Sequence, residues 1–138
     1  MVIDNNILRN LIREGIVSSV NAKDCTIRVT FPDKDDFVSA ELKVVCNGSG
    51  KNKDYWLPDV DESVVCLFLP NSKNGNNVGY CLGTVYNAKD RPPAADQNKR
   101  IIRFSDNTSI EYDRATHQLS INCVGDIVVN GRNIYLNE

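Results

Sequence analysis

The chain has 138 residues, which is enough for one modest domain and an appendage. Its formal net charge of −2 gives no electrostatic argument for binding nucleic acid or an anionic membrane. There is no run of about 18 apolar residues and no basic N-terminal segment followed by a continuous apolar stretch, so we expect neither a membrane span nor a signal peptide.

The cysteines are odd in number and contain no C-x-x-C pair. Several of them interrupt apolar runs, where a free cysteine behaves as a small hydrophobic residue. We therefore expect a protein that folds in a reducing cytoplasm, without a disulfide framework and without a metal or cofactor site. The five are Cys25, Cys46, Cys66, Cys81 and Cys123.

Residues 1–14 are predicted to hold a short amphipathic helix over 4–14. Asp4 or Asn5 can cap it, Gly15 can stop it, and four apolar residues recur at helical spacing. One interpretation is a lid on the following domain, and the other is an element that docks onto a partner. The apolar residues are Ile7, Leu8, Leu11 and Ile12.

Residues 15–87 are predicted to be all strand. Five runs rich in β-branched and aromatic residues are separated by polar or glycine-bearing loops. Five strands in about 70 residues, without an internal helix, fit a small closed Greek-key barrel of the OB type. The runs are 16–20, 25–31, 41–45, 63–69 and 80–86, and the loops expected to vary or make contacts are 32–36, 46–54 and 71–77.

Residues 88–99 have two prolines, mixed charge and no apolar periodicity, so they predict a linker. Residues 100–138 then alternate apolar and polar side chains in five short runs, at 100–104, 109–113, 118–123, 126–130 and 133–137. The pair Asn130-Gly131 is a strong hairpin signal. The residues in phase are Ile102, Phe104, Ile110, Tyr112, Leu119, Ile121, Cys123, Ile127, Val129, Ile134 and Leu136.

The apolar face of this small sheet needs a cover, because isolated small sheets are marginal in water. The preceding barrel can supply it as in an ordinary sandwich, or three identical copies can meet around an axis with their apolar faces inside. Strands stacked along such an axis advance by about 4.8 Å each, so five would form a rod on the order of 25 Å long. We favour the second arrangement, a trimeric β-prism or β-helix.

Several motifs together resemble phage baseplate assembly protein V, the central spike of contractile tails. They are GIVSSVN at 15–21, CTIRVTFPD at 25–33, WLPDVDESVVCLFLP at 56–70 and GYCLGTVYN at 79–87, followed by a proline-bearing link and a repetitive tail. VgrG proteins of type VI secretion and the spikes of phage-tail-like bacteriocins are similar. The likeness covers most of the chain.

The resemblance implies a homotrimer whose barrels lie near the tail tube and whose prism points at the target cell envelope. In that family the spike closes the tube, joins a hub or tube-end protein and is driven through the envelope when the sheath contracts. Such a protein is assembled in the bacterial cytoplasm and resides in the tail baseplate.

Two family features are missing from this sequence. The link at 88–99 is too short for the lysozyme domain that some relatives insert there. Other relatives end in a histidine-rich, iron-binding apex, whereas the only histidine here is His117, far from the end. We therefore expect no metal at the tip and regard a separate PAAR-like tip protein as a candidate partner.

Other candidate sites have simpler interpretations. Trp56 could stack on a nucleic-acid base, but Lys51 and Lys53 nearby are offset by acidic residues, so a packing or subunit-contact role is favoured. His117 is expected in a solvated turn, with no nucleophile motif. The carboxylates of Asp33, Asp35 and Asp36 do not follow EF-hand spacing.

The sequence thus predicts an all-β protein with a short N-terminal helix, a five-stranded OB-type barrel and a C-terminal trimeric prism at 100–138. We expect a structural spike without catalytic activity and without nucleic-acid binding. The alternative is a monomeric OB-fold protein that binds single-stranded nucleic acid and carries a β extension.

Overall fold

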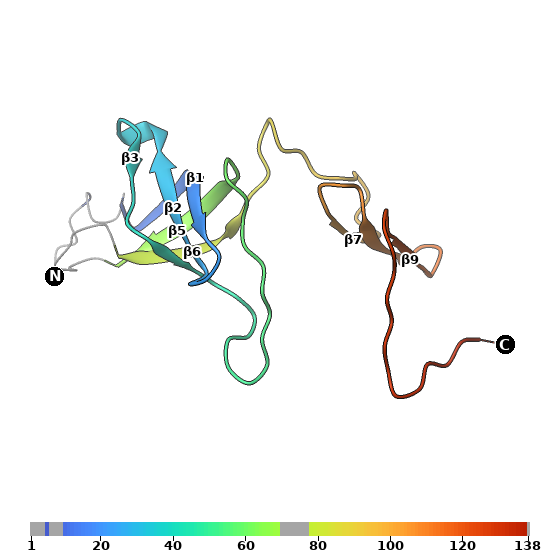
Figure 1. The fold of residues 1–138 in the computed structure, drawn as a ribbon. Helices are drawn as coiled ribbons and strands as arrows, with labels where there is room; N and C mark the ends of the chain where they lie inside the picture. Colours follow the sequence, from blue (N-terminus) through green and yellow to red (C-terminus); the bar gives the residue numbers. More distant parts are fainter. Residues whose placement is uncertain (1–4, 6–9, 70–77, 138) are drawn as a thin grey trace. The chain divides into compact units, whose positions relative to one another are not determined.

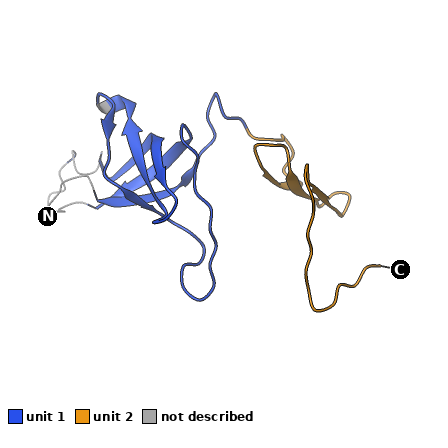
Figure 2. Cartoon of the chain, viewed as in Figure 1, with its two compact units in different colours: residues 1–91 blue, residues 92–138 orange. Residues whose placement is uncertain are grey.

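The computed structural model describes residue 5, residues 10–69 and residues 78–137. The chain divides into two compact units, residues 1–91 and residues 92–138 (Figure 2). The division falls inside the predicted linker at 88–99.

Unit 1 is a closed barrel of short strands (Figure 1). The strands pair in the order β1-β5-β6-β4-β2, and β1 also pairs with β2, which closes the ring. β4 and β6 pair in parallel, the other described pairs are antiparallel, and β3 extends the sheet beyond β2. The prediction of an all-β chain with a closed five-stranded barrel is confirmed, and the topology is consistent with the OB type. The strands are β1 (Ile12–Asn21), β2 (Thr26–Phe31), β3 (Phe37–Val38), β4 (Leu42–Val44), β5 (Ser63–Phe68) and β6 (Gly79–Thr84).

The barrel interior is filled by alternate side chains of its strands, as period-2 patterning requires. Phe31 and Phe68 meet edge to face, with ring centroids 5.6 Å apart. Leu57, from the long connection between β4 and β5, packs against this core. The buried hydrophobic residues are Val17, Ile27, Val29, Phe31, Leu42, Val64, Cys66, Phe68 and Cys81.

The prediction of a helix over 4–14 is wrong for its last three residues, which belong to a strand. Asn10 and Leu11 have helical backbone geometry, but β1 begins at Ile12, whose side chain is exposed on the barrel. Gly15 does not stop a helix: it lies inside β1, where a Cβ atom would come within 2.3 Å of Val29 Cγ1. Strand pairing of 12–16 with β5 therefore outweighs the local helical spacing. The docking residues Ile7 and Leu8 lie outside the described residues, and Leu11 is half-buried.

The structure describes two of the three loops that were expected to vary or make contacts. Residues 32–36 contain the 3-10 turn Pro32–Lys34, followed by Asp35 and Asp36 with left-handed φ of 54° and 57°. Residues 45–62 form a long excursion between β4 and β5 (Figure 1), narrowed by an antiparallel bridge between Ser49 and Lys53. The predicted loop 71–77 lies outside the described residues.

Unit 2 contains a three-stranded antiparallel meander. It consists of β7 (Lys99–Arg103), β8 (Ser109–Asp113) and β9 (Gln118–Asn122), with β8 in the middle. These strands coincide with the first three predicted runs of the tail. In the described part of the chain, no helix has the length and apolarity needed to cross a membrane.

Candidate functional site: the apolar face of unit 2

One face of the β7–β9 sheet collects the apolar side chains in aligned rows. Ile102 pairs with Ile110, which in turn pairs with Ile121 on β9. The adjacent row on this face joins Tyr112 and Leu119. Opposite side chains in antiparallel sheets lie about 4.5–5.5 Å apart at Cβ, so these rows make a continuous apolar surface. We call Ile102, Phe104, Ile110, Tyr112, Leu119 and Ile121 the apolar face of unit 2.

The apolar face has no cover in the single chain. Leu119 is 62% exposed and Ile121 is 54% exposed, and every member is at least 36% exposed. All hydrophobic side chains that are buried among the described residues belong to unit 1. Unit 2 therefore has no core of its own, and single copies would leave a large contiguous apolar patch in water.

The other face of the same sheet carries mostly polar side chains, with Ile101 as the apolar exception. Lys99 Nζ lies 3.9 Å from Glu111 Oε1 across β7 and β8. Such a partly solvated pair contributes little free energy. Most side chains of this face are half-buried, whereas those of the apolar face are exposed, so within one chain the polar face is the more covered of the two.

Two turns fix the register that aligns the rows. Between β7 and β8, Asn107 has a φ of 71°, and the backbone N–H of Thr108 donates to Asp106 Oδ1 at 2.9 Å. That backbone hydrogen bond holds the pKa of the exposed Asp106 carboxyl below its ordinary value. Between β8 and β9, His117 has a φ of 60° and is exposed, so it occupies a turn position. Register matters because a one-residue slip would move the apolar residues to the other face.

The last two predicted strands, 126–130 and 133–137, are not formed in the single chain. Residues 123–137 have no strand assignment, and neither Asn130 nor Gly131 has a positive φ, so the predicted hairpin turn is absent there. The segment is tied to the sheet by Val124, whose N–H donates to Thr108 Oγ1 at 3.2 Å. A strand requires a neighbouring strand, and this chain places none beside the segment. Its predicted core residues are all exposed: Cys123, Ile127, Val129, Ile134 and Leu136.

Period-2 reasoning missed three apolar residues of this segment. Val124, Val128 and Tyr135 are out of phase with the predicted core, yet they are equally exposed, with Val128 at 77% and Tyr135 at 87%. The signal was present in the sequence, because 127–129 and 134–136 are unbroken apolar triplets. Continuous apolar runs are typical of strands that are buried on both faces.

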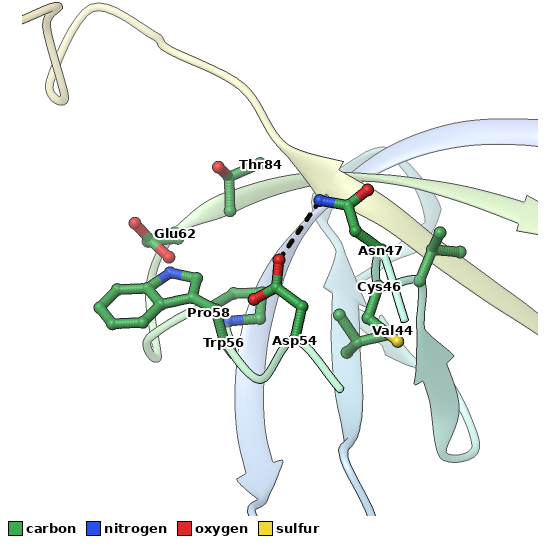
Figure 3. A pocket seen from close by; sticks show the side chains of 9 residues that line it. Val44, Cys46, Asn47, Asp54, Trp56, Pro58, Glu62 and Thr84 are labelled. Carbon is green, nitrogen blue, oxygen red and sulfur yellow. Dashed lines mark hydrogen bonds between the residues drawn. The ribbon is translucent and has the colours of Figure 1, made fainter. Parts of the chain in front are cut away.

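A small pocket lies on the barrel beside the long β4–β5 connection (Figure 3). Its volume is about 180 Å³, below the range of about 300–1,000 Å³ usual for small-molecule sites. Asn47 Nδ2 donates to Asp54 Oδ2 at 3.4 Å, and Glu62 Oε2 accepts from the backbone N–H of Asp59 at 2.8 Å. Both carboxylates thus stabilise the loop itself.

Trp56 forms one wall of this pocket and is largely exposed (Figure 3). No basic residue lines the pocket, and Asp54 and Glu62 make it acidic. An acidic pocket repels phosphate, so its chemistry gives no support to base stacking.

Titratable side chains in the described ranges form no candidate metal site. No three His, Cys, Asp or Glu side chains among these residues are grouped to hold a metal ion. Asp33, from the acidic turn, lies 3.9 Å from the buried Arg13 guanidinium. All five cysteines are free thiols.

Comparison with known proteins adds no assignment. None of the models of known protein families matches the sequence, and a search of curated proteins returns no relative.

Proposed function

We propose that this protein is the central spike of a contractile phage tail or a phage-tail-like particle, and that it acts as a homotrimer. The exposed apolar face of unit 2 carries the proposal. Three copies with these faces turned inward would bury the rows of Ile102, Ile110 and Ile121 in one shared core. Burial of such side chains is the main favourable term in association.

Other copies are a better source of strand partners for 126–137 than the barrel is. Closure by the β1–β2 pairing leaves the five-stranded ring without a free edge, and the open edge at β3 is only two residues long. Unit 2, in contrast, has two open edges, at β7 and β9. Strands that have no partner within their own chain can pair between chains, so the terminal segment would complete a β-prism or β-helix in the trimer.

The apolar triplets support an intertwined arrangement of the terminal segment. If each run forms its own strand, Val128 lies on the face opposite Ile127 and Val129. In the second run, Tyr135 lies on the face opposite Ile134 and Leu136. Strands from neighbouring copies could then cover one face while the axis covers the other. A core packed in this way resists compression, which a piercing rod requires.

The proposed spike needs no catalytic activity. Its barrel would join the hub or tube-end protein, with Leu11 and Ile12 as part of the docking surface, and its distal end would carry a PAAR-like tip protein or meet the target envelope directly. Sheath contraction would supply the force. The spike would contribute shape, stiffness and attachment, and it would lie in the tail baseplate after assembly in the bacterial cytoplasm.

The location of the protein tests this function. Gold-labelled antibodies against the chain should mark one end of contractile particles from producing cells, at the baseplate, and should leave the sheath unlabelled. Purified protein should also fail to retain single-stranded DNA at physiological salt. Retention of DNA by a monomer, together with particles that carry no label, would favour the nucleic-acid-binding alternative and contradict the spike.

A further inference from the structure

We propose that Cys66 and Cys81 are an oxidation site inside the barrel, where hydrogen peroxide converts the two thiols to a disulfide that joins β5 to β6. The two residues are direct partners in the antiparallel β5–β6 pair. Both side chains point into the barrel and are fully buried. This inference concerns unit 1 alone and does not depend on the proposed spike function.

The backbone spacing suits a disulfide. Directly opposite residues in antiparallel strands have Cα atoms about 4.5–5.5 Å apart. A disulfide accepts Cα separations of about 4.4–6.8 Å, so the bond can form without moving the strands apart. The pair lies next to a β-bulge, where β6 has one extra residue around Leu82 and Gly83 has a φ of 152°. A bulge gives local freedom to adjust the two sulfur atoms.

The side chain of Arg13 is a buried cation next to the Cys66–Cys81 pair. Arg13 pairs with Cys66 across β1 and β5, so the inner face carries Arg13, Cys66 and Cys81 side by side on three neighbouring strands. The Arg13 guanidinium is buried, and its Nη2 has no hydrogen-bond acceptor among the described residues. A positive charge next to a thiol pair favours the thiolate, which is the reactive form.

The two thiols differ in acidity. The hydrogen bond from Cys66 lowers the pKa of Cys81, whereas the same bond and burial raise the pKa of Cys66. Cys81 is therefore the thiol that reacts first. Because both sulfur atoms are buried, the oxidant must be small and uncharged, as hydrogen peroxide is.

The reaction balances as a two-electron oxidation. The Cys81 thiolate attacks one peroxide oxygen, the O–O bond breaks, and the departing hydroxide takes a proton to become water, which leaves a sulfenic acid on Cys81. The Cys66 sulfur then attacks the Cys81 sulfur. The S–O bond breaks, and the sulfenic oxygen leaves as a second water with the proton of Cys66. One peroxide is reduced to two waters while two thiols become one disulfide.

Mass spectrometry on the full chain tests the site. The background variant Cys25→Ser/Cys46→Ser/Cys123→Ser leaves only the buried pair. Peroxide should lower its mass by about 2 Da, the two thiol hydrogens. Proteolysis should then yield one linked peptide pair from β5 and β6, and Tm should rise by about 5 °C or more until a reducing agent is added.

Three variants in the same background separate the causes. Cys81→Ala, or Cys66→Ala if the first does not fold, should remove the mass loss while circular dichroism stays native. Arg13→Met should slow disulfide formation by roughly tenfold, the effect of about one unit in thiol pKa. An unchanged rate in Arg13→Met would remove Arg13 from the site.

Three outcomes would overturn the proposal. The first is that both thiols survive a peroxide dose that oxidises Cys123 in the wild-type chain. The second is oxidation to sulfinic acid without a cross-link. The third is a disulfide that forms only in denaturant or only between chains.

Discussion

At Gly15, the backbone of β1 passes close to the side chains of the barrel core. A Cβ atom there would meet Val29 Cγ1 at 2.3 Å and the Phe31 ring at 2.8 Å. Gly15→Ala should therefore lower the free energy of unfolding by about 1–3 kcal/mol, the usual cost of overpacking a core. Urea denaturation measures it. Gly50→Ala, at a position with no atom within 4 Å of the added Cβ, is the matched control and should stay within about 0.5 kcal/mol.

Arg13 is a buried charge whose packing resembles that of a hydrophobic side chain. Its guanidinium lies 3.9 Å from the centroid of the Phe31 ring, and its ionic partner Asp33 is exposed. Replacing a poorly paired buried ion by an apolar side chain of similar length is often neutral or stabilising. Arg13→Met should thus leave the free energy of unfolding unchanged within about 1 kcal/mol, or raise it.

Two further variants test whether Arg13 stabilises the barrel by its charge or by its packing. Asp33→Asn should change the unfolding free energy by less than about 0.5 kcal/mol, because an exposed ion-pair partner contributes little. Arg13→Ala should cost more than Arg13→Met, because it removes the contact with Phe31 and leaves a cavity. A loss above about 2 kcal/mol in Arg13→Met would mean that the charge itself stabilises the barrel.

Among the strands, those of the β7–β9 sheet expose an apolar face that the single chain does not cover. Ile110 lies in the middle of the central row, between Ile102 and Ile121. Ile110→Asp would place a charge in the shared core, so the dissociation constant of the oligomer should rise by more than about tenfold. Sedimentation equilibrium measures this change.

The control for Ile110 lies on the opposite face. Asn122 pairs with Ser109 in the polar rows of the same sheet. Asn122→Asp adds the same charge without entering the apolar face, so association should change by less than about threefold. Equal weakening by the two variants would mean that the apolar face is not the contact surface.

Local patterning predicted the elements whose partners lie in the same chain. Alternation in 25–31 and 63–69 located β2 and β5, because each buries one face in the barrel. The helix over 4–14 was predicted too far, since helical spacing is a weak preference and pairing with β5 decides the conformation of Ile12. The alternation pattern could not predict that Cys66 lies opposite Cys81, because the register between β5 and β6 depends on how the barrel closes.

For the terminal segment 123–137, local patterning predicted strands that the single chain does not form. Alternation correctly selected an exposed apolar face on β7–β9, but it also predicted strands at 126–130 and 133–137 that one chain does not form. A strand needs a hydrogen-bonding neighbour. Periodicity in the sequence indicates which faces of a strand are apolar, but it does not indicate which chain contributes the neighbouring strand. The triplets at 127–129 and 134–136 are the feature that predicts covering from both sides.

Across the whole chain, unit 1 has a core of its own, and we expect unit 2 to depend on other copies for one. Unit 1 contains the buried hydrophobic residues and a closed ring of strands. Unit 2 contributes exposed apolar rows and a segment without strand partners. Association should therefore reside in residues 97–138, while a chain ending at Asp96 should keep the barrel fold.

The most direct test is the molecular mass of two chains in solution, the full protein and a version ending at Asp96. Sedimentation equilibrium should give three copies for the full chain and one copy for the shortened chain, with a native β-sheet circular dichroism spectrum in both. A monomeric full chain, or a shortened chain that remains trimeric, would contradict the claim that other copies of the chain cover the apolar face of unit 2.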